Sequence, residues 1–266
     1  MPGIFQDQLL SNKVAFVTGG GSGIGLRMAE RFAQHGSKVV LVGRKQEKLD
    51  AAAAAIRAAG GIAETAALDV RNYAAVEAAL QKTRERYAEI DILLCAAAGN
   101  FPAPVTGMSA NGFKAVIDID LLGTFNTCRA AYPFLRKPGA SIINISANHA
   151  VMPIAWQAHV CAAKAGVELL TKTLALEWGP SGIRANCITP GPTDETEGMS
   201  RLAPTEAARQ RVERNVPLRR LGTKDELADL ALFLCSGAAS YITGAVYVCD
   251  GGLSLCRTEF AAAPAV

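Results

Sequence analysis

The sequence has no long apolar stretch. Its longest apolar runs are broken by charge within about a dozen residues, well short of the ~20 needed to cross a bilayer. The first residues, Met1 to Gln8, contain an acid and no basic cluster ahead of an apolar core, so they do not resemble a secretory signal. The last residues, Ala261 to Val266, lack a peroxisomal address of the Ser-Lys-Leu type. We therefore expect no membrane span and a cytoplasmic protein.

Cysteines are present, but not in the arrangement that disulfides or zinc would need. The seven cysteines are odd in number and scattered, and no C-x-x-C occurs. We therefore expect no disulfide framework and no metal site, and we expect most of the thiols to be small buried apolar groups. A formal net charge of +3 is too small to indicate a nucleic-acid partner, although a mildly positive surface suits a substrate that carries phosphates.

What the sequence does contain is a regular alternation of short β-branched runs and longer helical patterns. Its 266 residues, half of them hydrophobic, are enough for one domain, 1–266, with a substantial core. The predicted strands are Val14–Val17, Lys38–Val42, Ala63–Ala67, Ile92–Cys95, Ser141–Ile145, Arg184–Ile188 and Val246–Val248. The predicted helices are Ile24–His35, Glu47–Ala59, Tyr73–Tyr87, Asn111–Leu135, Ala155–Trp178 and Lys224–Cys235. Such alternation predicts a doubly wound α/β fold, Rossmann-like, with a seven-stranded parallel sheet and helices on both faces.

One segment, Thr193 to Asn215, interrupts this alternation. It contains one Pro, one Gly and many charges, and it is too long for a simple connection. It would lie beside the carboxyl ends of the strands, where open α/β sheets bind ligands. We interpret the segment as a substrate lid; a solvated surface insertion is the alternative.

A glycine-rich turn follows the first predicted strand directly. The run Thr18-Gly19-Gly20-Gly21-Ser22-Gly23-Ile24-Gly25 lies between that strand and an amphipathic helix, where glycines allow a tight turn and free N–H groups attract a pyrophosphate. The second strand ends in Gly43-Arg44-Lys45, without the acid that would bind a ribose 2′-hydroxyl. A guanidinium there favours a 2′-phosphate, so we expect NADP(H). The alternative is that Arg44 is only a solvated surface charge.

The spacing of Gly19, Gly23 and Gly25 resembles the T-G-x-x-x-G-x-G pattern of the short-chain dehydrogenase/reductase family. The resemblance extends over nearly the whole chain, through Asp69, Ala96-Ala97-Ala98-Gly99, Ser146, Lys164, Pro190-Gly191-Pro192 and Asp250-Gly251-Gly252. It implies that the cofactor contacts Gly19, Gly21, Ser22, Gly23, Ile24, Gly25, Arg44, Asp69, Val70, Ala97, Gly99, Lys164, Pro190 and Gly191.

The catalytic positions of that family are only half retained. Most members use Asn, Ser, Tyr and Lys, with the tyrosine protonating a carbonyl oxygen. By resemblance, this chain keeps Ser146 and Lys164 but has Val160 in place of the tyrosine and Asp120 in place of the asparagine. Because a buried acid needs a partner, we expect Lys164 to pair with Asp120, directly or through water. A water held by the two can then protonate carbon, which is general acid catalysis by relay.

This altered set resembles that of the 2,4-dienoyl-CoA reductases, particularly the peroxisomal kind. The shared details are Gly99-Asn100-Phe101, the Asp118-Ile119-Asp120 run leading to Gly123-Thr124-Phe125, His159, and Pro190-Gly191-Pro192 leading to Thr196-Glu197-Gly198. The resemblance implies NADPH-dependent reduction of a 2,4-dienoyl-CoA to a 3-enoyl-CoA in unsaturated fatty acid degradation. Hydride adds at Cδ and a proton at Cα, so the thioester oxygen needs hydrogen-bond donors rather than a proton of its own.

The same resemblance implies roles for individual residues. Asp120 orders the water, Lys164 positions the nicotinamide, and Asn100 or Ser146 holds the thioester carbonyl. Phe101, Ser109 and Asn111 line the acyl path, and Arg201 and Arg71 meet CoA phosphates; for each arginine, a solvated charge is the alternative. The family is commonly homotetrameric, with Asn111–Leu135 and Ala155–Trp178 packing against symmetry mates.

Other interpretations remain open at this point. The chain could reduce a 2-enoyl-CoA or another conjugated carbonyl, or it could be a catalytically silent NADPH-binding protein, although the retained Ser146, Lys164 and Asp120 argue against silence. The missing phenol argues against ordinary 3-ketoacyl reduction. His149 can supply a titratable donor to the pocket, but for His149 and for His159 we favour a structural or pocket-lining role. Cys95 replaces an asparagine that is frequent at the end of the fourth strand.

Overall fold

Seven parallel strands form one sheet in the computed structural model, which describes residues 5–256 of the chain. The strands are β1 (Val14–Thr18), β2 (Lys38–Gly43), β3 (Ile62–Ala67), β4 (Ile92–Cys95), β5 (Ser141–Ile145), β6 (Arg184–Pro190) and β7 (Val246–Cys249). Their order is β3-β2-β1-β4-β5-β6-β7, and every pairing is parallel. The predicted doubly wound α/β fold is confirmed, and each predicted strand agrees with an observed one to within two residues at either end.

The order of the strands reverses at the centre of the sheet. The chain runs outward from β1 to β3, then returns to place β4 on the other side of β1. All residues of β1 and β4 are buried, as expected for strands that are covered on both faces. Ligands of open α/β sheets bind at the carboxyl ends of the strands beside such a reversal. This places the expected site near the ends of β1, β4 and β5.

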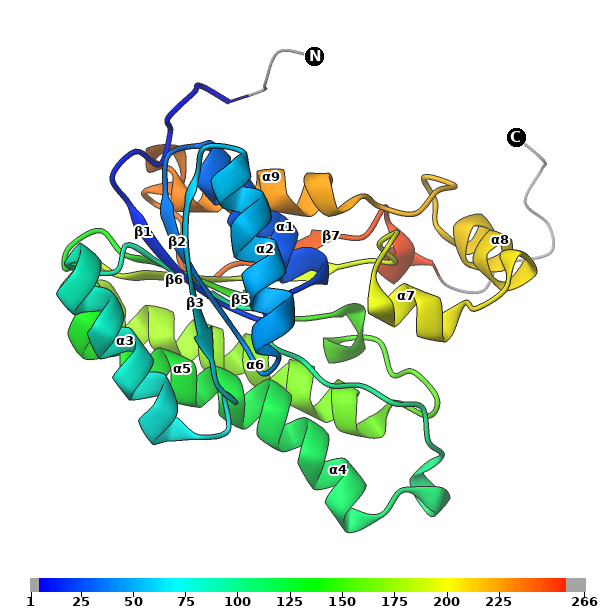
Figure 1. Cartoon of the computed structure of the whole chain (residues 1–266). Helices are drawn as coiled ribbons and strands as arrows, with labels where there is room; N and C mark the ends of the chain where they lie inside the picture. The colour runs from blue at the N-terminus through cyan, green and yellow to red at the C-terminus, as the bar shows by residue number, and fades with distance from the viewer. Residues whose placement is uncertain (1–4, 257–266) are drawn as a thin grey trace.

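Helices cover both faces of the sheet (Figure 1). On one face lie α1 (Gly23–Gln34), α2 (Gln46–Ala58) and α9 (Lys224–Cys235), and on the other lie α3 (Tyr73–Tyr87), α4 (Ala110–Val116), α5 (Gly123–Ala131) and α6 (Ala158–Trp178). Two apolar cores follow from this arrangement. Phe32 and Leu232 belong to the first core, whereas Leu80 and Ile142 belong to the second.

The long helix predicted over Asn111–Leu135 is not a uniform α-helix. A π-helical segment, η2 (Ile117–Leu122), separates α4 from α5, and a short 3-10 helix, η3 (Tyr132–Phe134), follows α5. Asp120 lies in the π-helical segment and is only 1% exposed. Wide helical turns of this kind are rare and occur frequently at functional sites. No periodicity in the sequence distinguishes this turn from an ordinary helix.

The helix α6 also begins three residues later than predicted. Its first residue is Ala158 rather than Ala155, because Pro153 and a left-handed Trp156 (φ +66°) precede it. A proline restricts the residue before it to extended conformations, and a left-handed residue cannot continue a right-handed helix. The residues ahead of α6 therefore form a loop at the carboxyl end of β5.

The segment predicted as a lid contains two helices, α7 (Glu197–Leu202) and α8 (Glu206–Asn215). Thr196 and Thr205 cap them, each side-chain oxygen accepting a hydrogen bond from a backbone N–H three residues on. The two helices project at one end of the sheet, beyond β7 in the view of Figure 1.

Within the described residues, no helix is long and apolar enough to span a membrane. All seven cysteines are free, and four of them are buried: Cys95, Cys128, Cys187 and Cys235. Burial raises the pKa of Cys187 to about 12, so this thiol stays protonated and unreactive. No group of three or more His, Cys, Asp or Glu side chains between residues 5 and 256 is placed to hold a metal ion.

Candidate active site

The glycine-rich turn packs tightly against the start of the loop after β4. Gly19 has a left-handed backbone (φ +68°), and a Cβ there would lie 2.5 Å from the carbonyl oxygen of Ala96. A Cβ at Gly25 would lie 2.6 Å from the carbonyl oxygen of Gly19. No side chain larger than hydrogen fits at either position, so the turn leaves its backbone open to a ligand.

Helix α1 starts from this turn with free backbone donors. Ser22 stands at the N-cap, and its side chain makes no capping hydrogen bond. The first turn, which includes Gly23 and Ile24, carries no acidic residue. Uncapped N–H groups and the positive end of the helix dipole form an anion site. The geometry therefore fits the pyrophosphate of a dinucleotide.

Two arginines and an acid gather where β2 and β3 end. Arg71 donates to both carboxylate oxygens of Asp69, with Nε 2.9 Å from Oδ1 and Nη2 2.6 Å from Oδ2. This hydrogen bonding, with a further contribution from the charge of Arg44, lowers the pKa of Asp69. Arg44 itself is exposed. The structure thus places Arg71 beside Asp69 and within electrostatic reach of Arg44, at the sheet end where a dinucleotide would place its adenosine.

The loops after β3, β4 and β6, which would surround the cofactor, are closely packed. Val70 Cγ2 lies against Gly123 at the start of α5, and Gly99 lies against the side chain of Ile119. Gly191, which follows Pro190 at the end of β6, lies against the backbone of Asp250. A side chain at Gly123 or Gly191 would collide with these neighbours. These contacts hold the loops after β3, β4 and β6 in place around the carboxyl end of the sheet.

Asp120 and Lys164 form a buried ion pair. Lys164 Nζ lies 3.1 Å from Asp120 Oδ2, with the two side chains 7% and 1% exposed. The sequence predicted this pairing either directly or through water, and the contact is direct. The Lys164 ammonium donates to the carbonyl of Ile145 (3.0 Å), and the Gly99 N–H donates to Asp120 Oδ1 (2.7 Å). Among the described residues, Asp120 Oδ2 has no donor besides the paired ammonium, and its remaining lone pair can accept a hydrogen bond from a water.

Val160 occupies the position where the family tyrosine would stand, and it is 3% exposed. It packs in a small apolar cluster with Val116 and Ala163. The side chain supplies no proton and no hydrogen bond. One turn before Lys164, the helix is therefore apolar where most of the family would place a phenol.

Ser146 makes a hydrogen bond that the sequence did not indicate. Its hydroxyl donates to Glu168 Oε1 (2.8 Å), and the Thr189 hydroxyl donates to the same oxygen (3.1 Å). Glu168 is itself buried, on α6 one turn beyond Lys164. A serine hydroxyl has a single proton. In this arrangement Ser146 offers a substrate only acceptor lone pairs.

Buried polar atoms without partners concentrate at this end of the sheet. Eight such atoms occur among the described residues; two of them, Arg31 Nε and Asp229 Oδ1, are 3.1 Å apart in an ion pair. Asp120 Oδ2 is likewise in an ion pair, 3.1 Å from Lys164 Nζ, and the other five are Asn100 Oδ1, Asn148 Oδ1, His149 Nδ1, Gln157 Oε1 and His159 Nε2. Buried polar groups are nearly always satisfied, so a cluster of exceptions indicates a place for water, substrate or cofactor.

The two histidines of this cluster differ in their surroundings. The Val160 N–H donates to His159 Nδ1 (2.9 Å), so the ring proton of neutral His159 lies on Nε2. The Phe101 ring meets this imidazole edge-on, with centroids 4.5 Å apart. Burial first, and then the charge of Lys164, lowers the pKa of His149. His149 is therefore neutral at physiological pH.

The residues expected along the acyl path have distinct positions. Phe101 is 37% exposed and its ring covers Gly112. Ser109 caps α4, because its Oγ accepts from the Gly112 N–H (3.0 Å), and Asn111 is exposed in the first turn of that helix. Arg201 of α7 donates to the carbonyl of Asn100 (3.2 Å) while pairing with Glu197. The segment 193–215 thus contacts the loop that follows β4.

A nucleotide-binding turn, a doubly wound sheet and a buried lysine at the start of α6 define a nicotinamide-dependent oxidoreductase. The family model described as Enoyl-(Acyl carrier protein) reductase matches residues 19–254. The chain belongs to the short-chain dehydrogenase/reductase family.

Individual relatives agree over nearly the full length. The chain is similar to the peroxisomal 2,4-dienoyl-CoA reductase [(3E)-enoyl-CoA-producing] of Danio rerio, with 44% identity covering 94% of this chain and 84% of that protein. A short chain dehydrogenase from Bacillus anthracis superimposes with a TM-score of 0.84 at 40% identity, covering 93% of this chain and 99% of that one. A gluconate 5-dehydrogenase from Burkholderia cenocepacia in complex with NADP and tartrate superimposes with a TM-score of 0.88 at 33% identity, covering 94% and 99%.

Proposed function

We propose that this protein reduces 2,4-dienoyl-CoA thioesters to 3-enoyl-CoA thioesters with NADPH, in the degradation of unsaturated fatty acids. The observation that carries the proposal is the buried Asp120–Lys164 pair, 3.1 Å apart, in a site where Val160 excludes protonation of a ketone oxygen. The 44% identity to a relative named as a 2,4-dienoyl-CoA reductase supports the substrate class.

The thioester oxygen needs a hydrogen-bond donor as the dienolate develops. NADPH, when bound on the glycine-rich turn, supplies the hydride that adds at Cδ of the dienoyl group. Electron density then moves to the thioester oxygen, where donors stabilise it more strongly than in the ground state. Asn100 and Ser146 are the two candidate donors to this oxygen. Asn100 is favoured, because the single hydroxyl proton of Ser146 is already used in a hydrogen bond to Glu168. Asn100 Oδ1 has no partner, so its amide can turn to present the NH2 group.

The second half of the reaction is protonation at Cα. A water that donates to Asp120 Oδ2 would lie beside the Asp120–Lys164 pair, where the carboxylate and the ammonium polarise it. The apolar Val160 beside them keeps the carbon end of the substrate free of competing hydrogen bonds. Lys164 would also hold the nicotinamide ribose.

The cofactor preference rests on the end of β2. Exposed Arg44 would bind the 2′-phosphate of NADP(H), in a place where no carboxylate of β2 repels it. The pyrophosphate would be bound by the glycine-rich turn, at Gly19, Gly21, Ser22, Gly23, Ile24 and Gly25. The two nucleosides would be bound by Asp69, Val70, Ala97, Gly99, Lys164, Pro190 and Gly191. Arg201, which reaches the Asn100 loop, would meet the CoA phosphates.

A second candidate is the reduction of simple 2-enoyl thioesters, which the description of the matching family model favours. Parallel NADPH oxidation assays with a 2,4-dienoyl-CoA, a 2-enoyl-CoA and a 3-ketoacyl-CoA separate the possibilities. We expect rapid oxidation with the dienoyl substrate, and the enoyl product identified by mass spectrometry. Turnover of the ketone alone would disprove the proposal, and no turnover with any of the three would favour a silent NADPH-binding protein.

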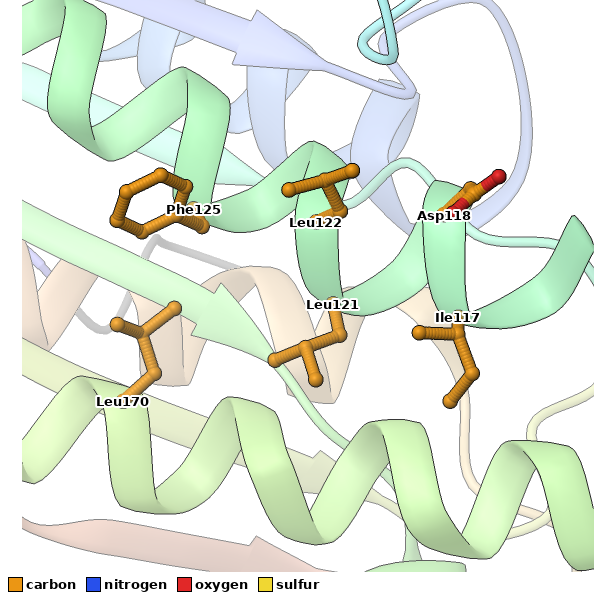
Figure 2. Close-up of a pocket in the computed structure, with 6 residues that line it drawn as sticks. All are labelled: Ile117, Asp118, Leu121, Leu122, Phe125 and Leu170. Atoms are coloured by element: carbon orange, nitrogen blue, oxygen red, sulfur yellow. The ribbon is translucent and has the colours of Figure 1, made fainter. Parts of the chain in front are cut away.

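We also propose a homotetramer, built on an apolar face of this chain. A groove of about 360 Å³ lies on this face. Figure 2 shows its lining residues, which come from the π-helical segment with α5 and from the facing helix α6. It is lined by Ile117, Asp118, Leu121, Leu122, Phe125 and Leu170. Leu122 and Phe125 are 42% and 44% exposed, and Leu169 and Leu176 on α6 are exposed further. A second copy of the chain would bury this face; light scattering of wild type and Phe125→Ser would show the mass fall.

We propose that the chain acts as a single domain, with 193–215 as its lid, in the cytoplasm. The contact of Arg201 with the Asn100 carbonyl supports the lid, because it joins α7 to the loop that carries the site. The Danio rerio relative is named as peroxisomal, which is the alternative compartment. Fluorescence microscopy of the tagged chain, with the tag in a surface loop, distinguishes the two.

A further inference from the structure

The loop between β5 and α6 exposes an unbroken apolar segment. After the 3-10 helix η4 (Asn148–Ala150), residues 151–156 read Val-Met-Pro-Ile-Ala-Trp, with no charged or hydrogen-bonding group except the indole N–H. Val151 is 66% exposed, Ile154 39% and Trp156 63%. Scattered apolar residues are normal on a surface, but a contiguous group beside a polar pocket indicates a binding surface.

The backbone holds Trp156 outward at a cost. Its φ of +66° lies in the left-handed region, which bulky residues rarely adopt. The Trp156 carbonyl accepts a hydrogen bond from the Ala103 N–H (2.9 Å), which fixes the loop to the segment after β4. The Trp156 side chain, 63% exposed, is thus displayed by a strained backbone. Strain of this kind is retained where a ligand makes use of it.

The segment is continuous with the site. Gln157 and His159, the next residues along the chain, belong to the cluster of buried unpartnered polar atoms. The loop to which Trp156 is bonded carries Phe101 and Val105, which are 37% and 71% exposed. Apolar side chains from the loops after β4 and β5 therefore lie next to the buried polar side chains of the site along the chain. On the lid, α8 instead displays the exposed Arg211 and Arg214.

We propose that residues 151–156, with Phe101 and Val105, bind the distal hydrocarbon of a long acyl chain. The inference rests on the proposed function, because the conjugated head of the substrate must reach Asp120 and Lys164. An acyl-CoA carries a hydrocarbon at one end and phosphates at the other. The apolar loops can bury the hydrocarbon, and the arginines of the lid can attract the phosphates. The substrate class is accordingly long-chain rather than short-chain dienoyl thioesters.

The test is a chain-length series. With purified enzyme and NADPH, kcat/KM is measured for 2,4-hexadienoyl-, 2,4-decadienoyl- and 2,4-tetradecadienoyl-CoA. We expect the wild type to favour the longest over the shortest substrate by at least ~10-fold, from burial of the added methylenes. Trp156→Asn and Ile154→Ser should each reduce that ratio at least ~3-fold while leaving hexadienoyl turnover unchanged. Asparagine is chosen for position 156 because it tolerates a left-handed backbone.

The matched control is Ile62→Ser. Ile62 is 48% exposed, comparable with Ile154, but it begins β3 at the amino end of the sheet, opposite the site. The control should retain the wild-type ratio. If no dienoyl-CoA is reduced at all, the proposed function is what fails. If hexadienoyl-CoA is reduced but the wild type shows no length preference, or both variants keep it, the inference is wrong. It is equally wrong if the variants instead lose oligomer mass in light scattering or binding to phospholipid vesicles.

Discussion

Two regions of the site differ in their packing. One is the cofactor half, around the glycine-rich turn, and the other is the substrate mouth, formed by the loops after β4 and β5. At the glycine-rich turn, Gly19 and Gly25 pack so closely on neighbouring backbone that no side chain fits, and strands β1 and β4 are entirely buried. At the mouth, five buried polar atoms of the described residues lack partners, apolar side chains of the loops face water, and Trp156 has a strained backbone. The first region is closely packed and offers a ligand mainly backbone N–H groups, whereas the second offers side chains that lack partners within the protein.

This difference in packing indicates that the first region recognises the cofactor and that the second carries out the chemistry. A closely packed turn with free N–H groups recognises what every dinucleotide shares, so it needs little besides backbone. Chemistry at the mouth depends on side chains from the loop after β4, from η2 and from α6, such as Asn100, Asp120 and Lys164. Substitutions in the two regions should therefore affect different kinetic constants.

The largest effect is expected at Asp120. Asp120→Ala should slow turnover of a 2,4-dienoyl-CoA at least ~100-fold, the usual scale for losing general acid-base help, and leave NADPH binding intact. Stopped-flow kinetics measures the rate of turnover, and a fluorescence titration measures the affinity for NADPH. The control is Asp118→Asn, in the same π-helical segment, whose carboxylate pairs with Lys114 near the surface; it should be nearly wild type. Undiminished turnover of Asp120→Ala would remove this residue from the mechanism.

A comparison of Asn100 with Ser146 sharpens the account of the mouth. Asn100→Ala should lower kcat about 100-fold, as the loss of an oxyanion donor does. Ser146→Ala should lower it less than ~10-fold, because this hydroxyl already donates to Glu168 and its removal costs mainly stability. Steady-state kinetics with thermal unfolding of both variants tests the order. If Ser146→Ala had the larger effect on kcat, the hydroxyl would have to turn from Glu168 to the substrate.

A smaller effect is expected in the cofactor half, at Arg44. Arg44→Gln should raise KM for NADPH at least ~10-fold, which is the loss of one charge-assisted hydrogen bond, and leave kcat and the KM for NADH nearly unchanged. Lys82→Gln, another exposed cation but on α3, serves as the control. An equal loss of affinity for NADPH and for NADH would mean that Arg44 does not bind the 2′-phosphate.

The smallest effect concerns pH and His149. Burial lowers the pKa of His149 in the folded protein, so the unfolded chain takes up a proton first as the pH falls. His149 therefore contributes stability that is present above about pH 6.5, its unfolded pKa, and lost as the pH falls through the folded pKa. The unfolding temperature of His149→Phe should decline less between neutral and mildly acidic pH than that of wild type. An equal decline in both proteins would contradict this.

Local patterns predicted much of this structure. All seven strands, the fold class and the helices Tyr73–Tyr87 and Lys224–Cys235 follow from hydrophobic periodicity and turn residues, which act over a few neighbours. The helix predicted over Asn111–Leu135 was wrong in detail, because a π-helical segment differs from an α-helix only in hydrogen bonding. The start of α6 was misplaced because the left-handed conformation of Trp156 depends on a hydrogen bond from a distant loop.

Glu168 shows most clearly what the sequence could not reveal about the site. An acid on a mostly apolar helix, four residues after Lys164, was the only available signal, and it did not specify a partner. The hydrogen bonds from Ser146 and Thr189 join residues about twenty positions away along the chain. Which of the candidate donors remained free for a substrate could therefore be decided only once β5, β6 and α6 were packed together.

By itself, the sequence determined the parallel fold, the nucleotide-binding turn and the absence of a phenol at Val160, because each depends on the identity and spacing of neighbouring residues. Only the tertiary structure decided that Asp120 pairs directly with Lys164, that Ser146 donates to Glu168, and that residues 151–156 are exposed. These features arise where segments far apart in the chain converge. Distance, angle and exposure there are set by packing of the whole sheet rather than by any one segment.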